Sequence, residues 1–195
     1  MDTMSSLTVE ERERLTGYLA DAHNAVLRTV RPFSNPQLDF KPAPDRWSIS
    51  ENVEHMMIVH NLVLNYIQQV IALPPSLKES AWIGREEKML EHIRSRATPL
   101  KVPEIGAPKN QWPHEELFRR FGETRDLLVE FSATTDAPLR SFCFPHPVFG
   151  EKDCYQWLLG LGAHCERHLD QIREITSSAD SRREPPPCSG VEFIR

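Results

Sequence analysis

The chain has 195 residues, of which 39% are hydrophobic and 26% are charged, an ordinary composition for a globular domain that can bury a core. The net charge is −5 and the 23 basic residues are scattered. Nucleic acid is therefore not an expected partner, because neutralising phosphates takes a clustered basic face. No apolar run approaches the roughly 20 residues of a membrane-spanning helix, and the polar residues 1–6 do not resemble a signal peptide. We expect one cytoplasmic domain with no membrane partner.

The first expected helix covers residues 9–31. Thr8 and Glu11 form a capping box, in which a hydroxyl and a carboxylate bind free amides at a helix start. Apolar residues then recur at helical spacing until a proline ends the run; they are Leu15, Leu19, Ala22, Val26 and Val30. Residues 32–47 are rich in proline and are expected to form an irregular connection. His23, inside the helix, is expected at the surface or at the edge of the core.

The second expected helix begins after Ser48 and runs to about residue 72, where two prolines follow. Ser48 and Glu51 form a second capping box. The expected inward stripe of this helix consists of Glu51, His55, Ile58, Leu62 and Tyr66. His60 lies about 140° round the helix from His55 and is expected to face elsewhere.

Two further long helices are expected, at about residues 114–134 and 153–177. Asp153 is the expected N-cap of the second. Residues 135–151 between them are expected to form a loop. No run alternates at period 2 for long enough to predict a sheet.

The remaining segments are a long connection and a tail. Residues 73–112 are punctuated by proline and carry a short expected helix at about 84–97. Residues 178–195, with three consecutive prolines, are expected to be a disordered tail. Four long helices joined by long links predict an all-α fold, a four-helix bundle with crossover connections, in a domain at residues 1–177.

The cysteines do not predict a disulfide or a metal site. Cys143, Cys154 and Cys165 recur every 11 residues, and Cys188 lies in the tail. Cys154 and Cys165 on one helix would be about 16 Å apart, too far to share a bond or an ion. We expect buried or surface thiols.

Three histidines form the candidate site. His164 and His168 are four residues apart, so both rings project from one helix face. That face is expected to point inward, because it also carries Trp157, Leu161, Gln171 and Ile175. His55 is a third inward histidine. The three rings could converge on one metal ion with an open position for water or substrate, as in catalytic sites. Alternatively, each is a core histidine with its own hydrogen bonds.

Two polar side chains could support such ligands. Glu51 lies one turn before His55 and Gln171 three residues after His168, and metal-binding histidines usually donate their second N–H to groups of this kind. The alternative for Glu51 is that it only completes its capping box. Three further histidines lie in links or at a helix start and are expected at the surface: His92, His114 and His146.

Two sets of short motifs resemble the signatures of the DinB-like (DinB/YfiT) superfamily. The opening set is Gln37-Leu38, Lys41-Pro42-Ala43-Pro44, Trp47-Ser48-Ile49-Ser50-Glu51 and His55. The closing set is His146-Pro147-Val148-Phe149-Gly150, Gln156-Trp157 and His164-Cys165-Glu166-Arg167-His168-Leu169-Asp170-Gln171-Ile172. No single piece is specific, but together and in order they span residues 9–176.

The resemblance implies a left-handed bundle of four helices, up-down-down-up. It also implies a site of three histidines that maps onto His55, His164 and His168 and holds one divalent transition metal, zinc, nickel or iron. Family members form dimers in many cases, so a homodimer is a further expectation. Some resemble transferases that use a low-molecular-weight thiol, and others are described as metal-dependent hydrolases.

Three functions follow as hypotheses. The first is a metal-dependent thiol S-transferase, in which the metal stabilises the thiolate of a thiol cofactor and presents it to a small electrophile. The second is a metal-dependent hydrolase with Glu51 as its catalytic base; few other polar residues line the helix seams, which weakens it. The third is a metal-binding or sensing bundle without catalysis.

Overall fold

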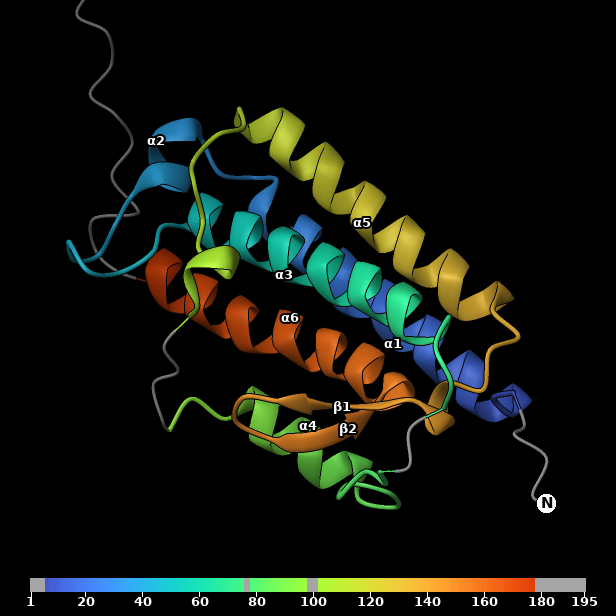
Figure 1. Ribbon diagram of the computed structural model, residues 1–195. Helices are drawn as coiled ribbons and strands as arrows, with labels where there is room; N and C mark the ends of the chain where they lie inside the picture. Colours follow the sequence, from blue (N-terminus) through green and yellow to red (C-terminus); the bar gives the residue numbers. More distant parts are fainter. Residues whose placement is uncertain (1–5, 76–77, 98–101, 178–195) are drawn as a thin grey trace, which may run out of the picture.

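A computed structural model describes residues 6–75, 78–97 and 102–177 (Figure 1). Its elements are, in order, α1 (Val9–Val30), α2 (Asn35–Asp39), α3 (Ile49–Val70), α4 (Glu86–Arg94), the 3₁₀ helix η1 (Glu104–Gly106), α5 (His114–Thr134), the 3₁₀ helix η2 (Leu139–Ser141), β1 (Cys143–His146), β2 (Gly150–Asp153) and α6 (Cys154–Ser177). The expected tail lies outside the described residues. Within them, no helix is long and apolar enough to cross a membrane.

The four long helices form the predicted bundle. Helices α1 and α3 each pack against both α5 and α6. Cross-helix hydrogen bonds fix the directions. Helices α1 and α5 are joined by Arg12 to Ser132 and Arg125 to Asn24. Helix α3 is joined to α5 and the residues just before it by Asn110 to Glu54 and Asn61 to Thr124, and to α6 by His168 to Asn52 and His60 to His164. Helices α3 and α5 therefore run opposite to α1 and α6, which is the up-down-down-up order.

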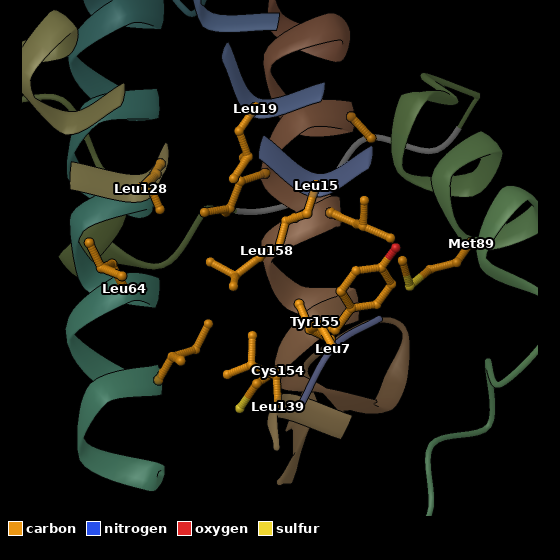
Figure 2. Close-up of a cluster of buried hydrophobic side chains, with 14 of the residues drawn as sticks. Leu7, Leu15, Leu19, Leu64, Met89, Leu128, Leu139, Cys154, Tyr155 and Leu158 are labelled. Atoms are coloured by element: carbon orange, nitrogen blue, oxygen red, sulfur yellow. The ribbon is translucent and has the colours of Figure 1, made fainter. Parts of the chain in front are cut away.

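Apolar side chains from all four long helices fill the bundle interior (Figure 2). Leu15 and Leu19 of α1, Leu128 of α5 and Leu158 of α6 are fully buried. Each such side chain stabilises the fold by about 1.5–3 kcal/mol relative to leaving it in water. A second cluster continues this core toward the N-terminal end of α3.

The predicted helix starts are confirmed. Thr8 and Glu11 at α1, and Ser48 and Glu51 at α3, each form the reciprocal hydrogen bonds of a capping box. In the first connection the expectation of irregular chain was wrong in part, because residues 35–39 form α2. Proline is tolerated in the first turn of a helix, where its missing N–H is not needed.

The expectation of a plain loop at residues 135–151 was also wrong. Strands β1 and β2 pair antiparallel there, with Phe144 opposite Lys152. The Phe144 ring stacks on Trp157 of α6, with centroids 4.5 Å apart, and its carbonyl accepts from Trp157 Nε1 at 3.2 Å. Four-residue strands are too short to show a reliable alternation, and packing on α6 decides their pairing.

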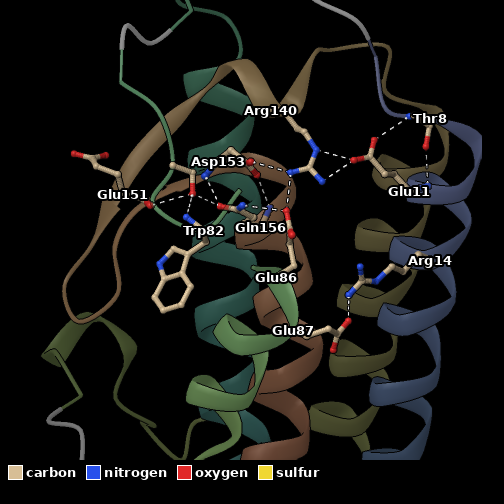
Figure 3. Close-up of polar contacts among 11 residues, drawn as sticks. Thr8, Glu11, Arg14, Trp82, Glu86, Glu87, Arg140, Glu151, Asp153 and Gln156 are labelled. Carbon is tan, nitrogen blue, oxygen red and sulfur yellow. Dashed lines mark hydrogen bonds and ion pairs between the residues drawn. The ribbon is translucent and has the colours of Figure 1, made fainter. Parts of the chain in front are cut away.

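Arg140, in η2, ties the hairpin to two helices (Figure 3). Its guanidinium donates to Glu11 of α1 at 2.7 Å, to Glu86 of α4 at 3.0 Å and to the buried Asp153 at 3.1 Å. Asp153 also accepts from the backbone N–H of Gln156, which caps the start of α6 as expected. The hairpin and α4 are thereby held beside α6.

The inward face of α3 differs from the predicted stripe. Ile58 and Leu62 are only partly buried, and Tyr66 is 48% exposed. The buried face instead runs along Val53, Met56, His60, Leu64 and Ile67. Helix α3 has apolar residues on two adjacent faces, and its contacts with α5 and α6 decide which one is covered.

Candidate metal centre

The structure brings His55, His164 and His168 together between α3 and α6. The Nε2 atom of His164 lies 3.2 Å from Nε2 of His55 and 3.1 Å from Nε2 of His168. One potential ligand atom from each ring lies within 4.8 Å of the others. His55 and His168 are buried and His164 is partly exposed. The antiparallel packing of the two helices places His55 beside the two turns that carry the other rings.

The other nitrogen of His55 and of His168 faces an oxygen that can only accept a hydrogen bond. His55 Nδ1 lies 2.6 Å from the Gly106 carbonyl, and His168 Nδ1 lies 2.9 Å from Asn52 Oδ1. The Asn52 amide is oriented by its own donation to the Ser48 carbonyl at 2.7 Å. Both rings must therefore carry their proton on Nδ1, which leaves a lone pair on Nε2.

A chain of buried rings also fixes the tautomer of His164, with its proton on Nδ1. His164 Nδ1 lies 3.1 Å from His60 Nε2, and His60 Nδ1 lies 2.9 Å from His23 Nε2. His23 Nδ1 lies 2.7 Å from the Leu19 carbonyl. Since that carbonyl only accepts, His23 donates to it, His60 donates to His23, and His164 donates to His60. This relay of three rings leaves the Nε2 of His164 with a lone pair as well.

Three lone pairs therefore face one another with no proton between them. Burial lowers the pKa of His55, His164 and His168, so a protonated ring does not resolve the repulsion at neutral pH. A cation does. Zinc–nitrogen bonds of about 2.0–2.1 Å in a tetrahedron set neighbouring nitrogens about 3.3 Å apart, close to the observed separations. The donor set fits a transition metal that accepts imidazole.

Two expectations about histidines were wrong. His60, expected to face away from the site, is fully buried and contacts His164. His23, expected at the surface or the core edge, is also fully buried and stacks on Phe121, with centroids 5.0 Å apart. The sequence signal that was available is the spacing of α3, in which His60 follows Val53 and Met56 on one helical face.

A second group, His23, His60 and Cys165, also has ligand atoms within 4.8 Å of one another. His60 Nδ1 would have to lose its proton to bind an ion there. That change would reverse the relay and place a proton on Nε2 of His164, which the first cluster excludes. Burial also raises the pKa of the Cys165 thiol. The relay and a second metal site are therefore alternatives.

Glu51 lies one turn before His55 on α3, but its oxygens are bound by other residues. Oε2 accepts from the Ser48 N–H at 2.8 Å, and Oε1 accepts from Lys41 at 2.6 Å and Asn110 at 3.1 Å. Burial acts to raise the pKa of Glu51, but these donors outweigh it and lower the pKa below its usual value. A pocket of about 380 Å³ adjoins Glu51, Lys41 and Asn110, and none of the three clustered histidines lines it.

The other predicted supporting and surface residues have distinct positions. Burial lowers the pKa of His168, and Gln171 opposes this effect by raising it. The hydrogen bond to His168 Nδ1 is made by Asn52, which the sequence did not single out. His92 is exposed, as expected. His114 is half-buried and pairs with Asp39 at 2.8 Å. His146 is half-buried between Phe149 and Trp157 and lies outside the cluster.

The comparison with protein families decides the relationship. The model of the DinB superfamily matches residues 12–172. The chain belongs to the DinB superfamily. This DinB protein is 28% identical over 147 residues to YuaE of Bacillus subtilis (strain 168), an uncharacterised protein, covering 75% of this chain and 87% of that one.

A solved structure has the same fold. YfiT from Bacillus subtilis is described as a probable metal-dependent hydrolase with an unusual four-helix bundle topology. It matches this DinB protein with a TM-score of 0.53, at 16% identity, over 88% of this chain and 89% of that one. At this identity the match establishes a shared bundle fold, and it says nothing further about chemistry.

Proposed function

We propose that this DinB protein binds one divalent transition-metal ion through the Nε2 atoms of His55, His164 and His168, and that it transfers a small thiol to an electrophile there. The observation that carries the metal site is the convergence of three Nε2 lone pairs whose partner nitrogens are all held as donors. Three neutral ligands leave the full charge of the ion to act on the nucleophile. When bound, the ion supplies Lewis acidity, which lowers the pKa of a thiol or a water molecule at its open position.

The residues around the cluster orient the ligands and keep water away. Gly106, Asn52 and His60 each accept the Nδ1–H of one ring and so fix its rotation. The indole of Trp47 packs beside His55 and His168, with centroids 4.7 and 6.1 Å away. This apolar cover weakens competition from water and strengthens the attraction of the site for an anionic nucleophile.

The carboxylate arrangement favours a thiol over water as the nucleophile. Deprotonating water needs a base beside it, and Glu51, the expected base, has both oxygens occupied by Lys41, Asn110 and Ser48. A thiol is already far more acidic than water, with an ordinary pKa of about 8.5. A thiol therefore ionises at the three-histidine metal site without a neighbouring base.

A hydrolase is the second candidate, supported by the description of YfiT, which shares the fold. In that case Glu51 would act as the base after releasing Lys41 or Asn110. A bundle that binds metal without catalysis is the third. Imidazole binds zinc, nickel and iron alike, so elemental analysis identifies the metal.

The metal proposal is tested by elemental analysis of the purified protein. We expect close to one transition-metal ion per chain, lost in the His55→Ala, His164→Ala and His168→Ala variants and retained in His92→Ala, whose ring is exposed. Metal binding should also raise the free energy of unfolding by about 2.7 kcal/mol at a hundred times the dissociation constant. Full metal content in His168→Ala would overturn the assignment.

The reaction is tested with metal-loaded protein, a panel of small thiols, and a halogenated aromatic or an epoxide as the electrophile. Faster conjugation than in the His168→Ala variant supports the transferase. Ester or amide cleavage without thiol, impaired in Glu51→Gln, supports the hydrolase instead. Absence of both activities in fully loaded protein favours the non-catalytic bundle.

A further inference from the structure

Lys152 is a buried lysine in the strand that leads into α6. It lies in β2, opposite Phe144 of β1, and only 2% of it is exposed. Lysine is almost never buried this completely unless it is paired. A residue of this kind therefore requires a reason beyond packing.

The ammonium group has no anionic partner among the described residues. Its neighbour Asp153 is bound by Arg140 and the Gln156 N–H, and its neighbour Glu151 is bound by Lys78. No hydrogen bond or ion pair joins Lys152 Nζ to any residue in the described part of the chain. The uncompensated burial lowers the pKa of Lys152 to about 7, against the opposing charge of Asp153.

Aromatic rings surround the Nζ atom instead. It lies 3.9 Å from the centroid of the Trp157 ring and 5.8 Å from that of Phe149. Contact with an aromatic face stabilises a cation, but the indole N–H of Trp157 is already donated to the Phe144 carbonyl. The aromatic contact therefore offsets only part of the cost of burying the charge, and it supplies no hydrogen-bond acceptor. All three of its hydrogen-bond donors remain available.

The position of Nζ connects it with the three-histidine cluster. A Cβ atom at Gly160 would lie 3.4 Å from Nζ, so the amine rests directly on α6 at that turn. Gly160 precedes His164 by four residues, which is about 6 Å along the helix. Trp157, Gly160 and His164 share one face of α6. The charge of Lys152 also lowers the pKa of His164, after the larger effects of burial, His55 and Arg167.

We propose that Lys152 binds the anionic group, a carboxylate, of a small-molecule substrate whose reacting end lies at His55, His164 and His168. This inference rests on the proposed function and adds the class of substrate to it. A carboxylate supplies the acceptor that Nζ lacks, with the strength of a charge-assisted hydrogen bond. The rings of Trp157 and Phe149 lie against Nζ itself, and the turn of α6 from Gly160 to His164 sets the length of the carbon chain between the two ends.

The probes for this proposal are thiols with and without a carboxylate. The protein is loaded with Co²⁺ and titrated with ω-mercaptoalkanoates of three to six carbons and with alkanethiols of the same lengths. Thiol binding is read from the thiolate-to-cobalt absorption band. We expect at least one carboxylate-bearing thiol to bind at least about tenfold more tightly than its uncharged counterpart, because a hydrogen bond to a charged group adds about 1.5–3 kcal/mol.

Two lysine variants locate the effect. The carboxylate preference should disappear in Lys152→Met, which keeps the length of the side chain and removes its charge, and should persist in Lys78→Met. Lys78 is an exposed lysine that binds Glu151 of the same hairpin. Retention of the preference in Lys152→Met, or equal affinity for both thiol series in the wild type, would overturn the proposal.

A second measurement does not depend on thiols or on a folded variant. Wild-type protein is treated with an amine-reactive ester, and modification of Lys152 is followed by mass spectrometry with and without glutarate. We expect glutarate to slow modification of Lys152 and leave that of Lys78 unchanged; equal rates at Lys152 would contradict the proposal. Failure to take up Co²⁺ would instead refute the metal site, which keeps the two failures distinct.

Discussion

At the scale of single residues, the burial of Lys152 should lower the free energy of unfolding by an amount that depends on pH. Burial lowers the pKa of Lys152 to about 7 from an ordinary value of 10.5. Below pH 7 the folded and unfolded chains both hold the proton, and the folded protein bears the full cost of burying the charge. Between about pH 7 and 10.5 only the unfolded chain holds it, so the free energy of unfolding of the wild type rises with pH.

Lys152→Met should remove this dependence. We expect the variant to be more stable than the wild type at pH 7 by at least about 1 kcal/mol, since one pKa unit corresponds to about 1.4 kcal/mol. The difference should shrink by pH 9.5. In this window Asp153, with its pKa raised by burial to about 6, stays ionised, and His146, with its pKa lowered by burial to about 3, stays neutral.

Urea unfolding at the two pH values measures the effect. Lys78→Met, at an exposed position, serves as the control and should show no gain at pH 7. A Lys152→Met protein that is less stable than the wild type at both pH values would mean that the contact with Trp157 outweighs the cost of burial.

At the scale of secondary-structure elements, the relay of His164, His60 and His23 links α6, α3 and α1. Replacing His60 with Leu would leave the Nδ1–H of His164 without its acceptor. Loss of such an outer hydrogen bond typically lowers metal affinity by about 10–100-fold. We therefore expect weaker metal binding in His60→Leu, although the sequence alone predicted that His60 faces away from the site.

His60→Gln provides the matched test. The glutamine oxygen can accept from His164 while its amide donates to His23, so the relay and the metal affinity should be largely restored. Competition with a chelating dye measures the dissociation constants, with His92→Leu as the exposed control. Equal metal affinities for the Leu and Gln variants would show that His60 only fills space.

At the scale of the whole molecule, the up-down-down-up order makes α1 and α6 parallel neighbours, and they approach closely at Gly162. A Cβ atom there would lie 2.6 Å from the Tyr18 ring. The ring cannot easily move, because its hydroxyl donates to Glu166 at 2.7 Å and accepts from Arg94 at 3.0 Å. Gly162→Ala should destabilise the protein by about 1–3 kcal/mol through overpacking.

Gly17→Ala is the matched control, because no atom lies within 4 Å of a Cβ at that exposed position of α1. Alanine is favoured over glycine inside a helix by up to about 1 kcal/mol, so this variant should be slightly more stable than the wild type. Thermal and urea unfolding measure both. A gain in stability for Gly162→Ala would contradict the close packing of α1 on α6.

The sequence by itself determined the long helices, their capping boxes and the three histidines of the cluster. These features are local patterns, which depend on neighbours within a few residues. They are the helical spacing, the capping residues Thr8 and Ser48, and the pair His164 and His168. Helical spacing also placed His55 on an inward face, and the resemblance of the motifs to the DinB-like signatures implied that the three histidines share one metal ion.

Only the tertiary structure decided the burial and contacts of His60, His23 and Lys152, and the pairing of the short hairpin. Each depends on which face of one helix meets which face of another. Helix α3 has apolar residues on two faces, so periodicity could not say whether His60 was covered. Lys152 lies in a strand of four residues whose burial is set by Trp157 and Gly160 on α6. Such contacts join residues far apart in the chain, and no local pattern encodes them.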